Sequence, residues 1–177
     1  MATKKVLLDH IHVKQDDITK ESTDAIVNAA NPSLLGGGGV DGAIHRAAGP
    51  GLLEECRKLG GCRHGEARLT GGHNLSARYI IHTPGPIYHN GKHGEADILK
   101  KSYDNSLQLA RDHGLRSISF PAISTGVYGY PKDEACKIAV DTALDFMQKN
   151  DYLIDIYFVL FDHENYKLYK DYLHGLK

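Results

Sequence analysis

The chain has 177 residues, the usual size of one domain that buries a continuous core without disulfides or a structural metal. Hydrophobic residues make up 41% and charged residues 24% of the sequence, which excludes a disordered chain. The 21 basic and 22 acidic residues give a net charge of -1, so no basic excess points to nucleic acid, and no apolar run is long enough for a membrane span. We therefore expect a single domain over residues 1–177, located in the cytoplasm.

The sequence contains three cysteines, at spacings that match neither a disulfide framework nor a paired zinc knuckle: Cys56, Cys62 and Cys136. We expect them to be reduced thiols. Two sets of side chains keep a metal site open as an alternative: Cys56 and Cys62 with His64, and His89 with His93. Asn90 and Gly91 break the helix that the second set would need. We expect no metal and no cofactor.

The first part of the chain alternates between strand and helix patterns around a run of glycines. Near alternation of apolar and polar residues predicts a strand at Val6–Val13, and a short apolar run predicts a buried strand at Ala25–Asn28. Four consecutive glycines, Gly36–Gly39, then precede a helix at Asp41–Ala48. A second helix, Leu52–Leu59, ends at a pair of glycines.

Strands and helices continue to alternate in the rest of the chain. The predicted elements are strands at Glu66–Thr70 and Tyr79–Thr83, a helix at Ile98–Asp112, a strand at Ser117–Ala122, a helix with Pro131 at its first position, a strand at Ile154–Phe161 and a helix at Glu164–Leu173. This alternation predicts an α/β fold with a largely parallel sheet and helices on both of its faces.

Two loops have the composition and the position expected of an anion site. Residues 28–42 and 123–130 each follow a predicted strand and are rich in glycine, and ligands of such sheets bind beyond the carboxyl ends of the strands. Glycine lets backbone amides approach a phosphate closely, and a following helix start adds its dipole. The alternative is that the glycines only form tight turns. Neither loop has the Walker or the dinucleotide signature, which disfavours nucleoside triphosphates and nicotinamide cofactors.

Asn31 and Asp41 flank the first of these loops. An amide can hydrogen-bond ribose hydroxyls, and a neighbouring carboxylate can orient or deprotonate a water molecule. Structural roles remain open, with Asp41 as a helix N-cap and Asn31 as a turn residue before Pro32. His45, one helical turn after Asp41, is either catalytic or structural.

A long continuous run, Asp24–Gly49, closely resembles the macrodomain family, and specifically its MacroD-type branch of O-acetyl-ADP-ribose and ADP-ribosyl-ester hydrolases. Further matching segments follow in the family's order: Asp17-Ile18-Thr19, Ile80–Thr83, Phe120–Pro131 and Tyr157–Asp162. The resemblance implies a three-layer α/β/α fold with a mixed central sheet. The chain departs from the family pattern at two positions. Asp16 adds negative charge where glycine is usual, and Pro84 stiffens a loop.

The resemblance also implies a role for each residue of the site. Asp17 would accept a hydrogen bond from the adenine amino group beside the Ile18 backbone, and Phe161 would stack on the adenine. Asn31 and Asp41 match the catalytic pair. The loops that would wrap the diphosphate and the distal ribose contain Gly38, Gly39, Val40, Ser124, Thr125, Gly126, Val127 and Tyr128. For Phe161 and Tyr128, packing in the core or at the rim is the alternative.

By this resemblance we expect a monomeric hydrolase that binds ADP-ribose and releases acetate from O-acetyl-ADP-ribose. Removal of single ADP-ribose groups from acidic side chains of proteins is a second expected activity. Asp41 acts either as the base or as the group that orients water while the substrate's phosphate assists. The alternative from another class is a non-catalytic reader of ADP-ribose, and an RNA-binding role is disfavoured because the chain lacks a basic stripe.

Overall fold

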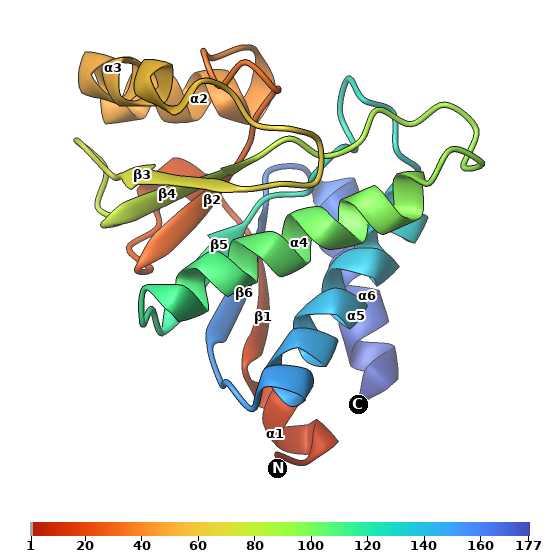
Figure 1. Ribbon diagram of the computed structural model, residues 1–177. Coiled ribbons are helices and arrows are strands. Elements are labelled where there is room, and N and C mark those ends of the chain that lie inside the picture. The colour runs from red at the N-terminus through yellow and green to blue at the C-terminus, as the bar shows by residue number, and fades with distance from the viewer. Residues whose placement is uncertain (1) are drawn as a thin grey trace.

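A computed structural model describes residues 2–177 of the chain (Figure 1). Its centre is a six-stranded sheet with the order β1-β6-β5-β2-β4-β3. The strands are β1 (Ile11–Gln15), β2 (Ala25–Ala29), β3 (Arg68–Gly71), β4 (Tyr79–Thr83), β5 (Ser117–Phe120) and β6 (Asp155–Leu160). All neighbouring strands are parallel except β3, which runs antiparallel to β4 at the edge of the sheet. The mixed, largely parallel sheet is therefore confirmed.

Helices cover both faces of this sheet. They are α1 (Lys4–Asp9), α2 (Gly39–Ala48), α3 (Pro50–Leu59), α4 (Glu95–Asp112), α5 (Lys132–Asn150) and α6 (His163–Leu176), with a short 3-10 helix η1 at Ile18–Lys20. The helices α1, α4, α5 and α6 share one hydrophobic core with the sheet, whereas α2 and α3 share a second core on the opposite face. The structure thus has the three α/β/α layers that the sequence predicts.

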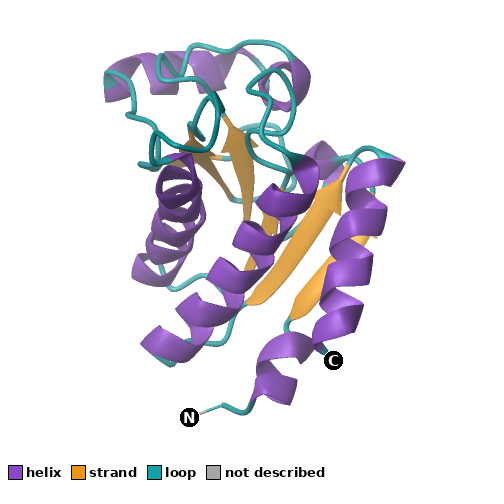
Figure 2. Ribbon diagram, turned by 90° about the vertical axis from the view of Figure 1, so that its right-hand side faces the viewer, coloured by secondary structure: helices purple, strands orange, loops and turns teal. Residues whose placement is uncertain are grey.

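The alternation of side chains along the strands divides the two cores. In β6, Phe158 packs in the larger core and its neighbour Val159 packs in the smaller one. In β2, Val27 and Ile26 divide in the same way, because successive strand residues point to opposite faces of a sheet. The long loops gather at one end of the sheet, where the strands deliver their carboxyl ends (Figure 2).

The predicted strand at Val6–Val13 is wrong in its first half. Residues Lys4–Asp9 form α1, and the strand begins only at Ile11. Thr3 caps this helix by accepting a hydrogen bond from the amide of Val6, and the adjacent Leu7 and Leu8 are both buried. A strand would have pointed these two leucines to opposite faces, so burial on one side of the sheet favours the helix.

The remaining predicted elements are present, with shifts at their ends. The helix expected at Ile98–Asp112 already begins at Glu95. Pro131 is the N-cap of α5 rather than its first helical residue. Within residues 2–177, no helix is both long and apolar enough to cross a membrane. The same residues hold three free, buried cysteines and no group of three or more histidine, cysteine, aspartate or glutamate side chains placed to hold a metal ion.

One buried carboxylate shapes the loop between β4 and α4. Glu95, at the start of α4, accepts hydrogen bonds at 2.7 to 3.2 Å from four backbone amides of the preceding loop, those of His89, Asn90, Gly91 and His93. The bond from His89 contributes most to lowering the pKa of Glu95 to about 2, and those from His93 and Gly91 add to it, whereas burial opposes the shift. The carboxylate therefore holds the loop in one shape at neutral pH.

We expect Glu95→Gln to lower the melting temperature at pH 7, because an amide offers fewer acceptor sites to the four N–H groups. The folded pKa is lowered from 4.5 to about 2, so the stabilisation is complete above pH 4.5 and is lost as the pH falls toward 2. Thermal unfolding at pH 7 and pH 3 measures this. Glu54→Gln, at an exposed carboxylate paired only with Arg57, is the control, and an E95Q deficit that is independent of pH would contradict the assignment.

Candidate functional site

Two adjoining cavities, of about 410 and 440 Å³, form one cleft beyond the carboxyl ends of β2, β5 and β6. Four residues line both cavities and mark where they join: Gly39, Val40, Ala122 and Gly126. This is the place where open α/β sheets bind their ligands. Every site residue predicted from the sequence lines one or both of these cavities.

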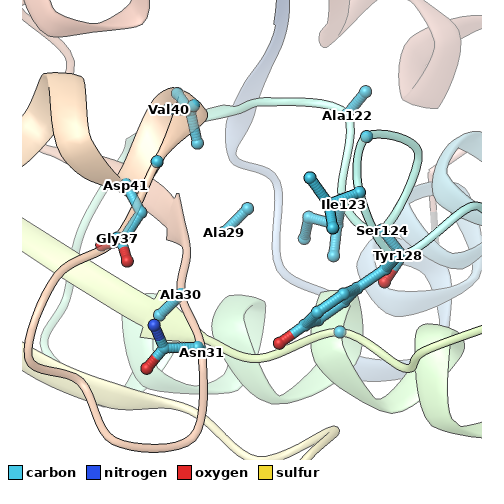
Figure 3. A pocket seen from close by; sticks show the side chains of 15 residues that line it. Ala29, Ala30, Asn31, Gly37, Val40, Asp41, Ala122, Ile123, Ser124 and Tyr128 are labelled. Atoms are coloured by element: carbon cyan, nitrogen blue, oxygen red, sulfur yellow. The ribbon is translucent and has the colours of Figure 1, made fainter.

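The first cavity contains the predicted catalytic pair. Asn31 and Asp41 lie on one side of it, and Tyr128 reaches in from the opposite loop with its hydroxyl directed toward Asn31 (Figure 3). Gly38, Ser124 and Val127 complete the predicted residues of this cavity. The structure therefore brings together groups that lie up to almost a hundred residues apart in the sequence.

The second cavity contains the residues predicted for adenine, Asp17, Ile18 and Phe161, together with Thr125 of the loop predicted to wrap the diphosphate. One carboxylate oxygen of Asp17 accepts from the amide of Thr19 at 2.9 Å and from its hydroxyl at 2.7 Å. These bonds keep the pKa of Asp17 below its ordinary value, so its other oxygen remains a charged acceptor. Phe161 is 86% exposed, which rules out the core-packing alternative for this residue.

Backbone amides dominate the join between the two cavities. The N-cap of α2 is Gly38, which has no side chain to bind the first amides of the helix. The amides of Gly39 and Val40 therefore remain available to an anion, and the helix dipole adds to their attraction. Since Gly38 is the cap, the alternative of Asp41 as the N-cap is wrong.

Asp41 is nearly inaccessible, with 5% of its surface exposed. Its Oδ1 accepts a hydrogen bond of 2.8 Å from the side-chain amide of Asn28 and lies 3.5 Å from Nε2 of His45. Burial raises the pKa of this carboxyl above its ordinary value, and the bond from Asn28 and the charge of His45 oppose the rise. A carboxylate with a raised pKa is a stronger base than one in water.

Asn31 has both the turn role and a place in the cleft. Its Oδ1 accepts from the amide and the hydroxyl of Ser33, and its Nδ2 donates to the carbonyl of Gly36 at 2.9 Å. A side chain on Gly37 would lie 3.1 Å from Oδ2 of Asp41 and 3.3 Å from Nδ2 of Asn31. The two polar side chains therefore converge on a glycine that leaves the space between them open.

The second loop is held in a conformation that few side chains adopt. Ser124 has a φ of 68°, in the left-handed region, and a side chain on the facing Gly85 would lie 2.2 Å from its hydroxyl. Tyr128 is joined to the loop before α4 by a backbone bond of 2.9 Å from Tyr88. Burial and the charge of Asp41 raise the pKa of Tyr128, so its hydroxyl remains a hydrogen-bond donor at neutral pH.

Several residues of the site could not be identified from their local sequence. Gly85, Arg46 and Asn165 line the cleft, but nothing in their local pattern sets them apart. Asn28 and His82 support Asp41 from below, and both are completely buried. A polar side chain at the inward position of an apolar strand is the signal that could have identified these last two.

Comparison with known proteins agrees with this geometry. Residues 27–139 match the family model of the Macro domain, and the chain belongs to the macrodomain family. An O-acetyl-ADP-ribose deacetylase of Escherichia fergusonii is 55% identical over 163 residues, which cover 90% of this chain and 92% of the relative. A Macro domain-containing protein of Methanosarcina mazei is 53% identical over 163 residues, covering 92% and 87% of the two chains.

Solved structures give the same result for the fold. The macrodomain of Trypanosoma brucei in complex with ADP-ribose has a TM-score of 0.90 and 46% identity, covering 96% of this chain and 72% of that one. The macrodomain of Oceanobacillus iheyensis with ADP has a TM-score of 0.88 and 47% identity, covering 93% and 90% of the chains. The resemblance predicted from the sequence is thus confirmed.

We expect Gly42→Ala to destabilise the protein, because its new methyl group would lie 2.5 Å from the carbonyl oxygen of Gly37. Alanine adds about 1 kcal/mol of helix propensity, and the clash costs about 1–3 kcal/mol, so a net loss of about 1 kcal/mol is expected. Gly175→Ala, within α6, is the matched control, since nothing lies within 4 Å of its new methyl group. Urea unfolding measures both variants, and equal midpoints would show that the loop gives way freely.

The raised pKa of Asp41 also predicts how stability depends on pH. The folded protein holds this proton more tightly than the unfolded chain, so the contribution is complete below the ordinary value of 3.8 and is lost as the pH rises through the folded pKa. Asparagine at position 41 carries no charge at any pH. The stability of Asp41→Asn relative to the wild type should therefore increase as the pH rises from 3.5 to 7. Melting temperatures test this against Asp145→Asn, at an exposed site in α5, and a gain that shrinks with rising pH would refute it.

Proposed function

We propose that this macrodomain is a hydrolase that binds ADP-ribose and cleaves esters of its distal ribose, releasing acetate from O-acetyl-ADP-ribose. The observation that carries the proposal is the convergence of Asn31 and the buried Asp41 at one end of a cleft whose other end suits adenine. Relatives that are 52–55% identical, including those of Citrobacter rodentium and Pantoea vagans, carry the name O-acetyl-ADP-ribose deacetylase.

In this proposal the ligand spans both cavities. Adenine lies against Phe161 and donates its amino hydrogen to Asp17, beside the Ile18 backbone. The diphosphate lies at the join, where amides of Gly38, Gly39 and Val40 face those of the second loop. That loop contributes Ser124, Thr125, Gly126, Val127 and Tyr128. Hydrogen bonds to a charged group contribute about 1.5–3 kcal/mol each, so a few amides suffice without a lysine.

Backbone amides that bind the diphosphate at the join would direct the distal ribose into the first cavity, toward Asn31 and Asp41. The remaining Nδ2 hydrogen of Asn31 is available to a ribose hydroxyl. Asp41 accepts a proton from a water molecule as that water's oxygen bonds to the ester carbon. The bond between the acyl carbon and the ribose oxygen then breaks, the proton on Asp41 passes to the ribose oxygen, and the acetic acid formed loses its remaining proton to solvent and leaves as acetate. No metal or cofactor takes part in these steps.

The same chemistry supports a second substrate class. An ADP-ribose group attached to an aspartate or glutamate of another protein is also an ester of the distal ribose, and its hydrolysis releases the free carboxylate. The first cavity opens to solvent beside Val127, whose side chain is fully exposed, so a bulky leaving group is not enclosed. We propose mono-ADP-ribosylated proteins as this second class.

We further propose that residues 1–177 act as one monomeric domain in the cytoplasm. Both hydrophobic cores share one sheet, which supports a single folding unit. The three cysteines are buried free thiols, which suits a reducing compartment.

We expect Asp41→Ala to reduce the turnover of O-acetyl-ADP-ribose by about 10²–10⁴-fold if Asp41 is the base, because the variant lacks a group that can accept the proton of water. Its affinity for ADP-ribose should change little, since Asp41 is nearly inaccessible. Acetate release and ADP-ribose calorimetry measure the two effects. Asp16→Ala, at the adenine end, is the control for loss of a cleft carboxylate.

Two results would contradict the proposal. Wild-type turnover that persists in Asp41→Ala would remove Asp41 from the chemistry. A wild-type protein that binds ADP-ribose tightly and releases no acetate would be a reader rather than a hydrolase.

A further inference from the structure

Beneath the cleft, a chain of buried polar groups leads away from Asp41. The side-chain amide of Asn28 donates to Asp41 Oδ1 at 2.8 Å and to Nδ1 of His82 at 3.1 Å. The other ring nitrogen of His82 lies 2.9 Å from the hydroxyl of Thr70. Asn28, His82 and Thr70 have no exposed surface, so the chain is sealed from solvent except at Asp41.

The register of the sheet creates this chain. Asn28 in β2 and His82 in β4 are directly paired, and both point to the face that α2 and α3 cover, as Ile26 and Ile80 do two residues earlier. The neighbouring strand β3 supplies Thr70. Three adjacent strands therefore each place one polar side chain in an otherwise apolar layer, below the helix that carries Asp41.

The donors and acceptors of the chain define a single proton arrangement. Asn28 Nδ2 can only donate, so Nδ1 of His82 must accept. Burial and the charge of His45 lower the pKa of His82 to about 3, so its ring is neutral and its proton is on Nε2. Nε2 then donates to the hydroxyl of Thr70, which donates in turn to the carbonyl of Gly71 at 3.2 Å.

The amide of Asn28 depends on both of its bonds. A flipped amide would turn its oxygen toward the carboxylate of Asp41 and toward the lone pair of His82 Nδ1, which is repulsive on both sides. In residues 2–177, Asn28 Oδ1 finds no hydrogen-bond partner. The orientation of the amide therefore relies on Asp41 at one hydrogen and His82 at the other.

We propose that His82, which does not line the cleft, is a positioning residue for ester hydrolysis: through Asn28 it fixes the carboxylate of Asp41 in the orientation that activates water. The inference rests on the proposed function. It explains why a neutral histidine is buried in an apolar layer, where an aliphatic side chain would pack without needing hydrogen bonds.

The test compares two substitutions of His82 and one of Thr70. His82→Leu fills the space but removes the acceptor for Asn28. His82→Asn places an amide oxygen near the position of Nδ1 and so keeps that acceptor. Thr70→Val breaks only the far end of the chain. We expect kcat for acetate release to fall about 10- to 100-fold in His82→Leu, and to stay close to the wild-type value in His82→Asn and Thr70→Val.

Two controls separate positioning from a general structural role. ADP-ribose calorimetry should give the same Kd for His82→Leu as for the wild type, which shows a folded cleft. In the Asp41→Ala background, His82→Leu should cause no further loss, because its effect passes through Asp41. A merely structural role would lower turnover in both backgrounds, and this result would overturn the proposal.

The pH profile gives a third readout. The groups that face Asp41 are His45, Tyr128, Cys56 and Asn28. Burial raises the pKa of Cys56 to about 11, so this thiol adds no charge at neutral pH. Because the Asn28 bond lowers the pKa of Asp41, loosening it should move the acid limb of the kcat/KM profile to higher pH in His82→Leu. An unmoved limb together with unchanged kcat overturns the proposal.

A direct measurement does not depend on activity. In ¹⁵N NMR spectra of the wild type at pH 7, His82 should show a protonated Nε2 and an unprotonated Nδ1. The opposite tautomer would overturn the proposed role of His82, because Nδ1 could then not accept from Asn28. A wild-type protein with the expected tautomer but no ester hydrolysis would overturn the proposed function and with it the role of His82. Full activity of His82→Leu would overturn the role of His82 alone.

Discussion

The amides at the start of α2 face a cleft in which carboxylates outnumber cations. Asp16, Asp17, Asp41 and Asp162 line its two cavities, and Arg46 is the one cation among the lining residues. Side-chain charge therefore works against a diphosphate, and the attraction must come from backbone N–H groups and the helix dipole. This requirement explains a cap without a side chain at Gly38 and a strained Ser124 in the facing loop, since both serve the path of the backbone.

The buried carboxylate imposes a second requirement. Asp41 loses hydration, which raises its pKa, and only Asn28 donates a close hydrogen bond to it from below. Apolar side chains could pack beneath α2 in place of Asn28, His82 and Thr70. The buried polar groups therefore make the protein less stable than apolar side chains of similar size would. That cost is typical of a site that needs one fixed orientation of a reactive group.

Much of this could be predicted from the sequence, and the exceptions have physical reasons. The glycine run before Asp41 and the apolar runs at β2 and β6 are local signals, so the site loops and the parallel sheet follow from them. The strand predicted over Val6–Val13 is wrong in its first half because Leu7 and Leu8 are both buried by α1 packing on α5, a tertiary effect. Asn28 and His82 became partners only through strand register, which no single segment reveals.

A crystal structure of the protein with ADP-ribose would show whether backbone amides, rather than side-chain cations, hold the diphosphate. We expect diphosphate oxygens within hydrogen-bond distance of the amides of Gly39 or Val40 and of the loop Ser124–Tyr128, with the distal ribose between Asn31 and Asp41. ADP-ribose bound outside this cleft would contradict it. So would a diphosphate held by side-chain cations, or a distal ribose turned away from Asp41.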